Sequence, residues 1–229
     1  MKKVIATTMA AFLVAQVASE ISATVDIASA YVFRGETFND GIVIQPGVEG
    51  EVAGYTVGAW ANIDVDAIEN GDSVSEIDLY IGRDLGSVAG WDFSAGLCEY
   101  TYPGAANDGT EDGETELSVS ASGSISGFDV SLGAYADIAE ESTPGYYELS
   151  TGGSTSLAGV ALDYGIALGY SADESDADGA ELETGIEFVA YSLSYEAAGG
   201  TITATYIDGR DDDIVEVDES LVFSYGIAL

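Results

Sequence analysis

The chain contains no histidine and very few basic residues. Of its 229 residues, 5 are Lys or Arg and 41 are Asp or Glu, which gives a formal net charge of −36. Lys2 and Lys3 lie in an N-terminal leader, so the rest of the chain carries only Arg34, Arg83 and Arg210. A phosphate backbone would be repelled by such a chain. We therefore exclude nucleic acid as a partner.

The absence of histidine also excludes hydrolysis by histidine-assisted nucleophiles. No Ser-His-Asp triad, Cys-His pair or histidine-containing zinc site is possible. A pair of carboxylates remains chemically possible, but among 41 acidic residues such pairs arise by chance. We expect no enzyme activity and no catalytic residues. The single cysteine, Cys98, cannot form an internal disulfide, and we interpret it as a small strand residue.

Beyond the leader, the chain lacks any long apolar run. The leader itself has two lysines followed by about 14 mostly apolar residues, which is typical of a secretory signal peptide and too short for a spanning helix. We expect a signal peptide at residues 1–23, cleaved after Ser19 or Ala23, and one domain at 24–229. Because no later segment has 18 consecutive apolar residues, membrane insertion would have to use strands.

What the chain does have is an alternation of apolar residues with polar or small ones, the period of a β-strand. It is clearest at 128–138, 160–170 and 221–229, over runs of about 10 residues, the length of a tilted membrane strand. The apolar phase slips after Phe188, which predicts a bulge or two shorter strands there. The pattern predicts twelve strands, within a range of 10 to 14: 24–34, 42–50, 55–63, 76–85, 91–100, 115–123, 128–137, 147–156, 160–170, 183–197, 201–207 and 219–229.

The connections between these strands alternate between short and long. The short ones contain glycine and a single acidic residue, Glu51: 51–54, 86–90, 123–127, 157–159 and 198–200. The long ones hold more than half of the acidic residues: 35–41, 64–75, 101–114, 138–146, 171–182 and 208–218. A soluble β-sandwich also alternates its faces, but this asymmetry of connections is typical of an outer-membrane barrel. We predict an all-β, antiparallel transmembrane β-barrel. Trp60 and Trp91, near strand ends, suit a membrane interface.

Several stretches resemble the TorF family of porins from proteobacteria, in order and along nearly all of the chain after the leader. They are IASAYVFRG, GYTVGAWANID, EIDLYIGRDL, CEYTYPGA, GTITATYIDGRD and SLVFSYGIAL. The resemblance implies an outer-membrane barrel of about this length that acts as a pore. Members of this family typically end in an aromatic residue, whereas this chain ends in Leu229.

If the apolar strand faces meet lipid, acidic residues face the interior or the rim. Arg34 would share the inner face of the first strand with Asp26, either narrowing the passage or forming a structural ion pair. A lumen lined with carboxylates favours cations. The acidity has a second explanation, a salt-rich habitat, and both stay open. The predicted pore-lining residues are Asp26, Arg34, Glu76, Asp78, Asp92, Glu116, Asp129, Asp137, Glu148 and Asp163.

The acidic connections offer weak candidates for metal ligands. The stretch 173–179 has hard oxygens at alternate positions but lacks the closing Glu of a calcium loop. We expect no tightly bound cofactor, and at most loosely bound divalent cations such as calcium. The candidate ligands are Asp176, Asp178, Asp211, Asp212 and Asp213.

Together these patterns predict a porin-like channel in the outer membrane of a Gram-negative bacterium. Its partners would be outer-membrane lipid, lipopolysaccharide, and small hydrophilic solutes or cations. The alternative is a closed structural or adhesive barrel whose acidic external loops bind divalent cations. A secreted soluble sandwich is a third possibility. The oligomeric state is left open by the sequence.

Overall fold

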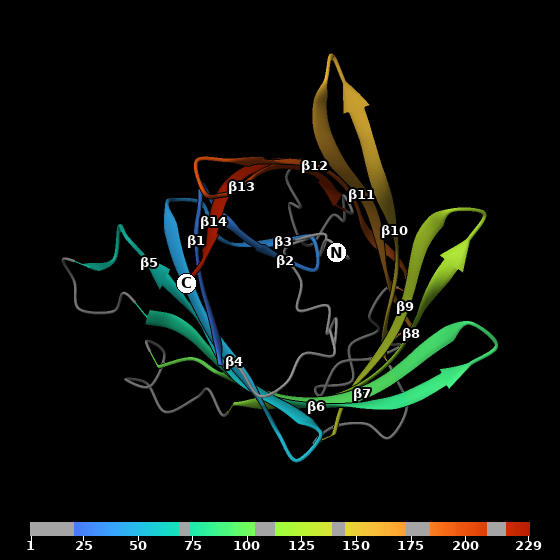
Figure 1. Ribbon diagram of the computed structural model, residues 1–229. Coiled ribbons are helices and arrows are strands. Elements are labelled where there is room, and N and C mark those ends of the chain that lie inside the picture. The colour runs from blue at the N-terminus through green and yellow to red at the C-terminus, as the bar shows by residue number, and fades with distance from the viewer. Residues whose placement is uncertain (1–20, 69–73, 104–112, 139–144, 173–183, 210–218) are drawn as a thin grey trace.

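The computed structural model describes residues 21–68, 74–103, 113–138, 145–172, 184–209 and 219–229. The expected signal peptide lies almost entirely outside these ranges. Twelve strands form one closed antiparallel barrel, and two short strands form a separate hairpin inside it (Figure 1). The barrel strands are β1 (Ser22–Ala28), β4 (Val43–Val52), β5 (Tyr55–Asp64), β6 (Val74–Val88), β7 (Trp91–Thr101), β8 (Glu114–Ile125), β9 (Phe128–Asp137), β10 (Tyr146–Leu157), β11 (Val160–Ser171), β12 (Gly185–Ala197), β13 (Gly200–Gly209) and β14 (Ser220–Ala228).

Each barrel strand pairs with its neighbours along the chain, and β1 closes the ring by pairing with β14. In this seam Asp26 lies opposite Gly226, and the amide of Leu229 donates to the carbonyl of Ala23 at 2.9 Å. Closure removes the exposed strand edges that would otherwise present unpaired backbone groups. The predicted all-β antiparallel barrel and its number of strands are confirmed.

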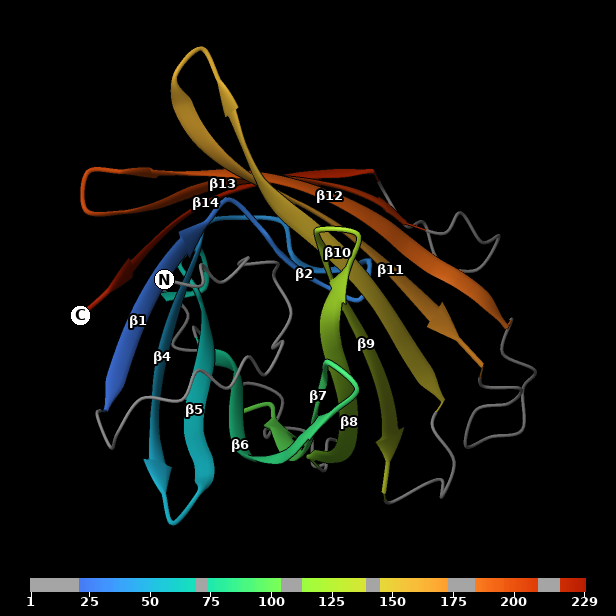
Figure 2. The same cartoon turned by 45° about the vertical axis from the view of Figure 1, so that its right-hand side comes forward.

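Five tight turns join the barrel strands at one end of the molecule. Each consists of a small residue followed by glycine, both with positive φ, as in Ala53 (55°) and Gly54 (79°). Two successive positive φ values are those of a type I′ turn, whose twist matches the twist of paired strands. The other four turns are Ala89-Gly90, Ser126-Gly127, Ala158-Gly159 and Ala198-Gly199. The predicted short connections are therefore confirmed, and Figure 2 shows how they join successive pairs of wall strands such as β4 and β5 or β10 and β11.

The two faces of the barrel wall differ in polarity. Direct cross-strand partners form outward rows of apolar side chains, such as Leu132, Leu149, Leu168 and Val189 on β9 to β12. Leu132 and Leu149 are 47% and 43% exposed. The exposed surface of the wall thus differs from that of a soluble protein, which seldom exposes large contiguous apolar patches. The wall is therefore built to contact an apolar surrounding.

The structure corrects the predicted first strand. The range 24–34 was expected to be one wall strand, but β1 ends at Ala28, and the chain then turns into the barrel. It forms β2 (Tyr31–Phe33) and β3 (Glu36–Asn39), where a simple loop was expected at 35–41. The predicted irregularity in the tenth segment is a bulge in a single strand, because Gly169 pairs with Phe188 and the next residue, Tyr170, pairs with Ile186.

A second correction concerns Trp60, which was expected at a membrane interface. It is on the inner register of β5, directly opposite Asp78, and its ring lies 5.5 Å from that of Tyr31. The aromatic ring therefore packs inside the barrel. Trp91, by contrast, has the register of the outer face, one residue before inward-facing Asp92 and close to a tight turn.

Substitution of Leu132 by Arg tests the outer face. In the middle of a lipid-facing row, an arginine is expected to lower the free energy of unfolding by about 2–4 kcal/mol. The measurement is urea-induced unfolding of the protein folded into lipid vesicles. The matched control is Ser131→Arg, which places the same charge one residue away on the inner face, between Ser122 and Ser150. Equal losses for both variants would contradict a lipid-facing exterior.

Candidate functional site

The interior of the barrel contains the inner hairpin, residues 31–39, formed by β2 and β3. Figure 1 shows it inside the ring of strands, following β1 and preceding β4. Its two-residue turn is Arg34-Gly35, with φ values of 51° and 91°. The turn therefore has the same type I′ geometry as the five tight turns of the wall. The inner hairpin therefore occupies part of the space that the wall encloses.

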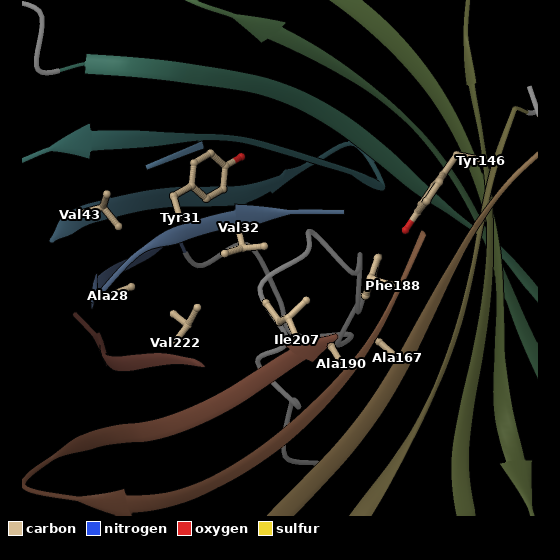
Figure 3. Packing of buried hydrophobic residues seen from close by; sticks show 10 residues of the cluster. All are labelled: Ala28, Tyr31, Val32, Val43, Tyr146, Ala167, Phe188, Ala190, Ile207 and Val222. Atoms are coloured by element: carbon tan, nitrogen blue, oxygen red, sulfur yellow. The ribbon is translucent and has the colours of Figure 1, made fainter. Parts of the chain in front are cut away.

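One side of the inner hairpin packs against apolar side chains of the wall. Val32 is 4% exposed and belongs to a buried cluster that also contains Val43, Ile207 and Val222 (Figure 3). Phe188 of β12 lies against the turn, where a Cβ added to Gly35 would come within 2.8 Å of the Cβ of Phe188. Apolar burial therefore holds the hairpin to the side of the barrel formed by β12, β13, β14 and β4.

The end of the inner hairpin is held by a polar network on β5. Asn62 is fully buried; its amide nitrogen donates to the Oδ1 of Asn39 at 2.6 Å and to the Oγ of Ser75 at 2.8 Å. Gln45 of β4 donates to the Oδ1 of Asn62 at 3.0 Å, and Asn39 donates to Asp64 at 3.1 Å. Leaving a buried amide without partners is costly, so this network fixes where β3 rejoins the wall.

The turn of the inner hairpin is held by an ion pair across the lumen. The Nη2 of Arg34 donates to the Oε2 of Glu116 on β8 at 2.6 Å, with the two side chains 22% and 11% exposed. The hydroxyl of Tyr100 on β7 donates to the other oxygen of Glu116 at 3.1 Å. Removing one member of a buried ion pair costs about 3–5 kcal/mol. The hairpin thus spans from β5 to β8 and is fixed at both ends.

Aromatic rings surround the guanidinium group of Arg34. Its Cζ lies 4.0 Å from the ring centroid of Tyr146, 4.9 Å from that of Tyr135 and 4.8 Å from that of Phe33. Cation–π contacts stabilise a desolvated cation. An arginine side chain stays protonated in proteins, and here the carboxylate of Glu116 compensates its positive charge. The group is therefore a permanent cation.

Three polar atoms around Arg34 have no hydrogen-bond partner. They are the Nε of Arg34, the hydroxyl of Tyr146 and the Oε2 of Glu148. Tyr146 and Glu148 are 8% and 9% exposed. Buried polar atoms are nearly always hydrogen-bonded in folded proteins. The surroundings of Arg34 therefore retain capacity for further donors and acceptors.

Nine of the ten residues predicted to line a pore have the register of the inner face of the wall. Glu76, Asp78, Glu116 and Glu148 are buried, and these surround the inner hairpin. Asp92, Asp129 and Asp163 lie nearer the tight turns, separated from that group. The inward register is carried by the pairs Asp26 with Gln45, Glu76 with Asn62, Asp78 with Tyr100, Asp92 with Ser122, Glu116 with Asp137, Asp129 with Gly152, Glu148 with Gly169 and Asp163 with Ser194.

The tenth residue, Arg34, is not where it was expected. It does not share a wall strand with Asp26 but lies at the turn of the inner hairpin, because the wall strand ends at Ala28. The expected ion pair with a lumen acid is present and joins Arg34 to Glu116. The cluster of Tyr100, Tyr135 and Tyr146 was not predicted from the sequence, and neither was the Asn62 network. The Arg34-Gly35 dipeptide could have predicted the turn of the inner hairpin, because it has the same X-Gly form as the five tight turns of the wall.

The candidate metal ligands lie outside the described residues. These are Asp176, Asp178, Asp211, Asp212 and Asp213, and their role stays a prediction. Within the described ranges, no group of three or more acidic, cysteine or histidine side chains is arranged to hold a metal ion. In the same part of the chain, no helix is long and apolar enough to cross a membrane.

Substitution of Gly35 by Val tests the seating of the inner hairpin. A β-branched side chain is strained at positive φ and would overlap Phe188, at a cost of about 1–3 kcal/mol. The turn of the hairpin is expected to shift away from Phe188 while the wall strands stay paired, so the single-channel conductance changes. The matched control is Gly54→Val, at a wall turn with positive φ and no atom within 4 Å of the added Cβ. Equal conductance in the Gly35 variant and the unsubstituted protein would contradict the seating.

The geometry defines a class: a closed antiparallel barrel with an apolar outside and a polar interior that contains a folded hairpin. A family described as "Bacterial protein of unknown function (Gcw_chp)" matches residues 14–219. The chain therefore belongs to this family. No curated protein matches it.

Solved structures with a similar fold are outer-membrane barrels. A KdgM porin in complex with disordered oligogalacturonate has a TM-score of 0.51 and 9% identity, covering 91% of this chain and 96% of that one. Outer membrane phospholipase A from Escherichia coli has a TM-score of 0.47 and 12% identity, covering 90% and 91%. The Salmonella typhi outer membrane phospholipase dimer with bound calcium has a TM-score of 0.48 and 14% identity, covering 91% of this chain and 90% of that one. At these identities the likeness to the porin shows the fold alone.

Proposed function

We propose that this protein is a porin-like channel of the outer membrane that passes small hydrophilic solutes and prefers cations. The observation that carries this proposal is the division between the two faces of one closed wall. Leu132 and Leu149 face outward, while Glu116 and Glu148 face inward from the neighbouring registers. The outside suits lipid, and a polar interior suits water and solutes. The resemblance to the TorF family and the shared fold with the KdgM porin support the same function.

Cation preference rests on the charges of the inner face. In the part of the chain that the structure describes, the basic residues are Arg34 and Arg83, and Arg83 is exposed on the outer register beside Tyr55. Among the described residues, Arg34 is thus the basic residue inside the barrel, where nine predicted pore-lining carboxylates also lie. Fixed negative charge in a narrow, low-dielectric passage attracts cations and repels anions.

No enzyme activity is part of the proposal. A likeness of fold does not decide whether a barrel is an enzyme. The argument is chemical: the chain has no histidine, so a histidine-assisted serine or cysteine nucleophile is excluded. The polar groups inside the barrel are then available for solute passage.

The second candidate is a closed structural barrel, and one observation favours it. The inner hairpin crosses the interior and is fixed to β5 through Asn39 and to β8 through Arg34. Such a barrel would act through its external surface, with lipopolysaccharide bridged by divalent cations at the acidic connections.

The deciding experiment is single-channel recording of the refolded protein in planar bilayers under a potassium chloride gradient. We expect discrete current steps and a reversal potential whose sign indicates that cations pass more readily than anions. Silence from protein shown to be folded and inserted would reject the channel and favour the structural barrel. Steps with an anion-selective reversal potential would reject the assigned preference.

A further inference from the structure

The side chains around Arg34 form a defined cage on the wall. The cage consists of Glu116 on β8, Tyr135 on β9, and Tyr146 and Glu148 on β10. It supplies two carboxylates and two aromatic rings whose centroids lie 5.6 Å apart. Guanidinium groups bind through hydrogen bonds to carboxylates and through contact with aromatic faces. The cage therefore has the chemistry of a guanidinium site.

The residue that occupies this cage belongs to the inner hairpin and not to the wall. Arg34 has a φ of 51°, a conformation that non-glycine residues adopt at a cost. The five wall turns place only Ala or Ser at the equivalent position. The long cationic side chain of Arg34 is thus held at this turn by its contacts with Glu116 and the two tyrosine rings of the wall.

The cage is not saturated by Arg34. The hydroxyl of Tyr146 and the Oε2 of Glu148 are buried in it without a hydrogen-bond partner, and the Nε of Arg34 is also unpaired. Both oxygens of one carboxylate, Glu116, already accept a hydrogen bond, one from Arg34 and one from Tyr100. The second, Glu148, has an acceptor free for a cationic donor.

Resting on the proposed channel function, we infer that Glu116, Glu148, Tyr135 and Tyr146 form a binding site for solutes that carry a guanidinium group. In the resting channel Arg34 occupies this site as a tethered internal ligand. A guanidinium-bearing solute in the lumen competes with Arg34 for the same carboxylates and rings. Binding of the solute then releases the turn of the inner hairpin from β8.

A metal ion fits the cage less well than a guanidinium group. Hard divalent cations take six or more oxygen ligands, whereas two of the four cage side chains present aromatic faces. An anion is disfavoured by Glu116 and Glu148. The planar shape and the several N–H donors of guanidinium match both kinds of side chain at once.

The test is isothermal titration calorimetry of agmatine into the refolded protein in detergent micelles. Arg34→Ala empties the cage, so agmatine is expected to bind this variant at least about tenfold more tightly than the unsubstituted protein, in which a tethered group competes. Adding Glu116→Gln and Glu148→Gln to Arg34→Ala should remove that gain. Putrescine, which has an amine in place of the guanidinium group, should bind the Arg34→Ala variant more weakly than agmatine.

Two matched controls accompany the titration. Arg83→Ala removes the other described arginine, which lies over the Tyr55 ring on the outer face, and should leave agmatine binding as in the unsubstituted protein. Glu51→Gln removes an exposed carboxylate beside a tight turn and should also change nothing. Arg34→Gln, which keeps a hydrogen-bonding side chain at the turn, is measured in parallel in case Arg34→Ala does not refold.

The result is separable from the channel test. Equal agmatine affinity in the Arg34 variants and the unsubstituted protein would overturn the site, even if the barrel conducts. Tighter binding that depends on Glu116 and Glu148 would establish the site, even if the protein is silent in bilayers and the channel proposal fails.

Discussion

Replacement of residues 30–41 by Asn-Gly is expected to raise the single-channel conductance severalfold. Ala28 and Val43 are direct partners in the β1–β4 ladder, so Ser29 and Ile42 would face each other next. Two residues are enough to close such a pair, and Asn-Gly prefers the type I′ turn. The variant removes the inner hairpin together with Arg34 while leaving every wall ladder in place. Conductance rises because the hairpin no longer occupies the lumen.

The control for this variant is the same Asn-Gly dipeptide placed at Ala158-Gly159. That turn joins β10 to β11 at the end of the barrel that carries the tight turns, away from the inner hairpin. The conductance of this control variant should therefore equal that of the unsubstituted protein. Folding of both variants is checked by circular dichroism and by the mobility shift between heated and unheated samples. A folded deletion variant with unchanged conductance would show that the inner hairpin does not limit the passage.

Neutralisation of the four buried acids around the inner hairpin is expected to abolish most of the cation preference. The variant carries Gln at positions 76, 116 and 148 and Asn at position 78. Each amide keeps the shape of the acid that it replaces and most of its hydrogen-bonding atoms. The positive charge of Arg34 then has no negative charge at any of these four positions. Fixed charges nearest the narrowest part of a pore dominate its selectivity. The reversal potential under a potassium chloride gradient should fall to near zero or change sign.

The matched control neutralises Asp92, Asp129 and Asp163, which face inward nearer the tight turns. Asp92 and Asp129 are exposed, so water screens them and their effect on the reversal potential should be small. An unchanged reversal potential in the four-residue variant would move selectivity away from the inner hairpin and toward the acidic connections.

The barrel wall was predictable from the sequence because its physics is local. A strand with lipid on one side and water on the other must alternate, and segments such as 160–170 carry that alternation in every second residue. The X-Gly dipeptides at residues 53–54 and 158–159 mark turns because glycine adopts a positive φ without steric cost. Nearest-neighbour pairing of successive strands then follows from short connections.

The inner hairpin was not predictable in the same way. Residues 24–34 continue the alternation past Ala28, so the pattern alone cannot tell a long wall strand from a strand that ends and folds inward. What decides between them is a set of long-range contacts, from Arg34 to Glu116 and from Gly35 to Phe188. These partners are far apart in the sequence, and no local period reports them.

Phe188 illustrates the same limit on a smaller scale. Its place in the sequence beside Ile186 gave both residues one expected face, but the bulge after Ile186 turns Phe188 inward against Gly35. The predicted pore-lining acids have the inward register because register along a strand depends only on parity, and their role in lining a passage stays a prediction. Their grouping around a cationic turn depends on tertiary structure.

The two-faced wall has a consequence for how the sequence can vary. Each wall position is constrained mainly by which side it faces, so many substitutions that keep polarity are acceptable and most that exchange it are not. The information that specifies the wall is close to one binary choice per residue, with the register shifting at irregularities in the β5–β6, β6–β7 and β11–β12 ladders. We therefore expect proteins that share this barrel to differ widely in the residues of the wall. The inner hairpin, whose contacts depend on individual side chains such as Arg34, is the part that we expect them to keep.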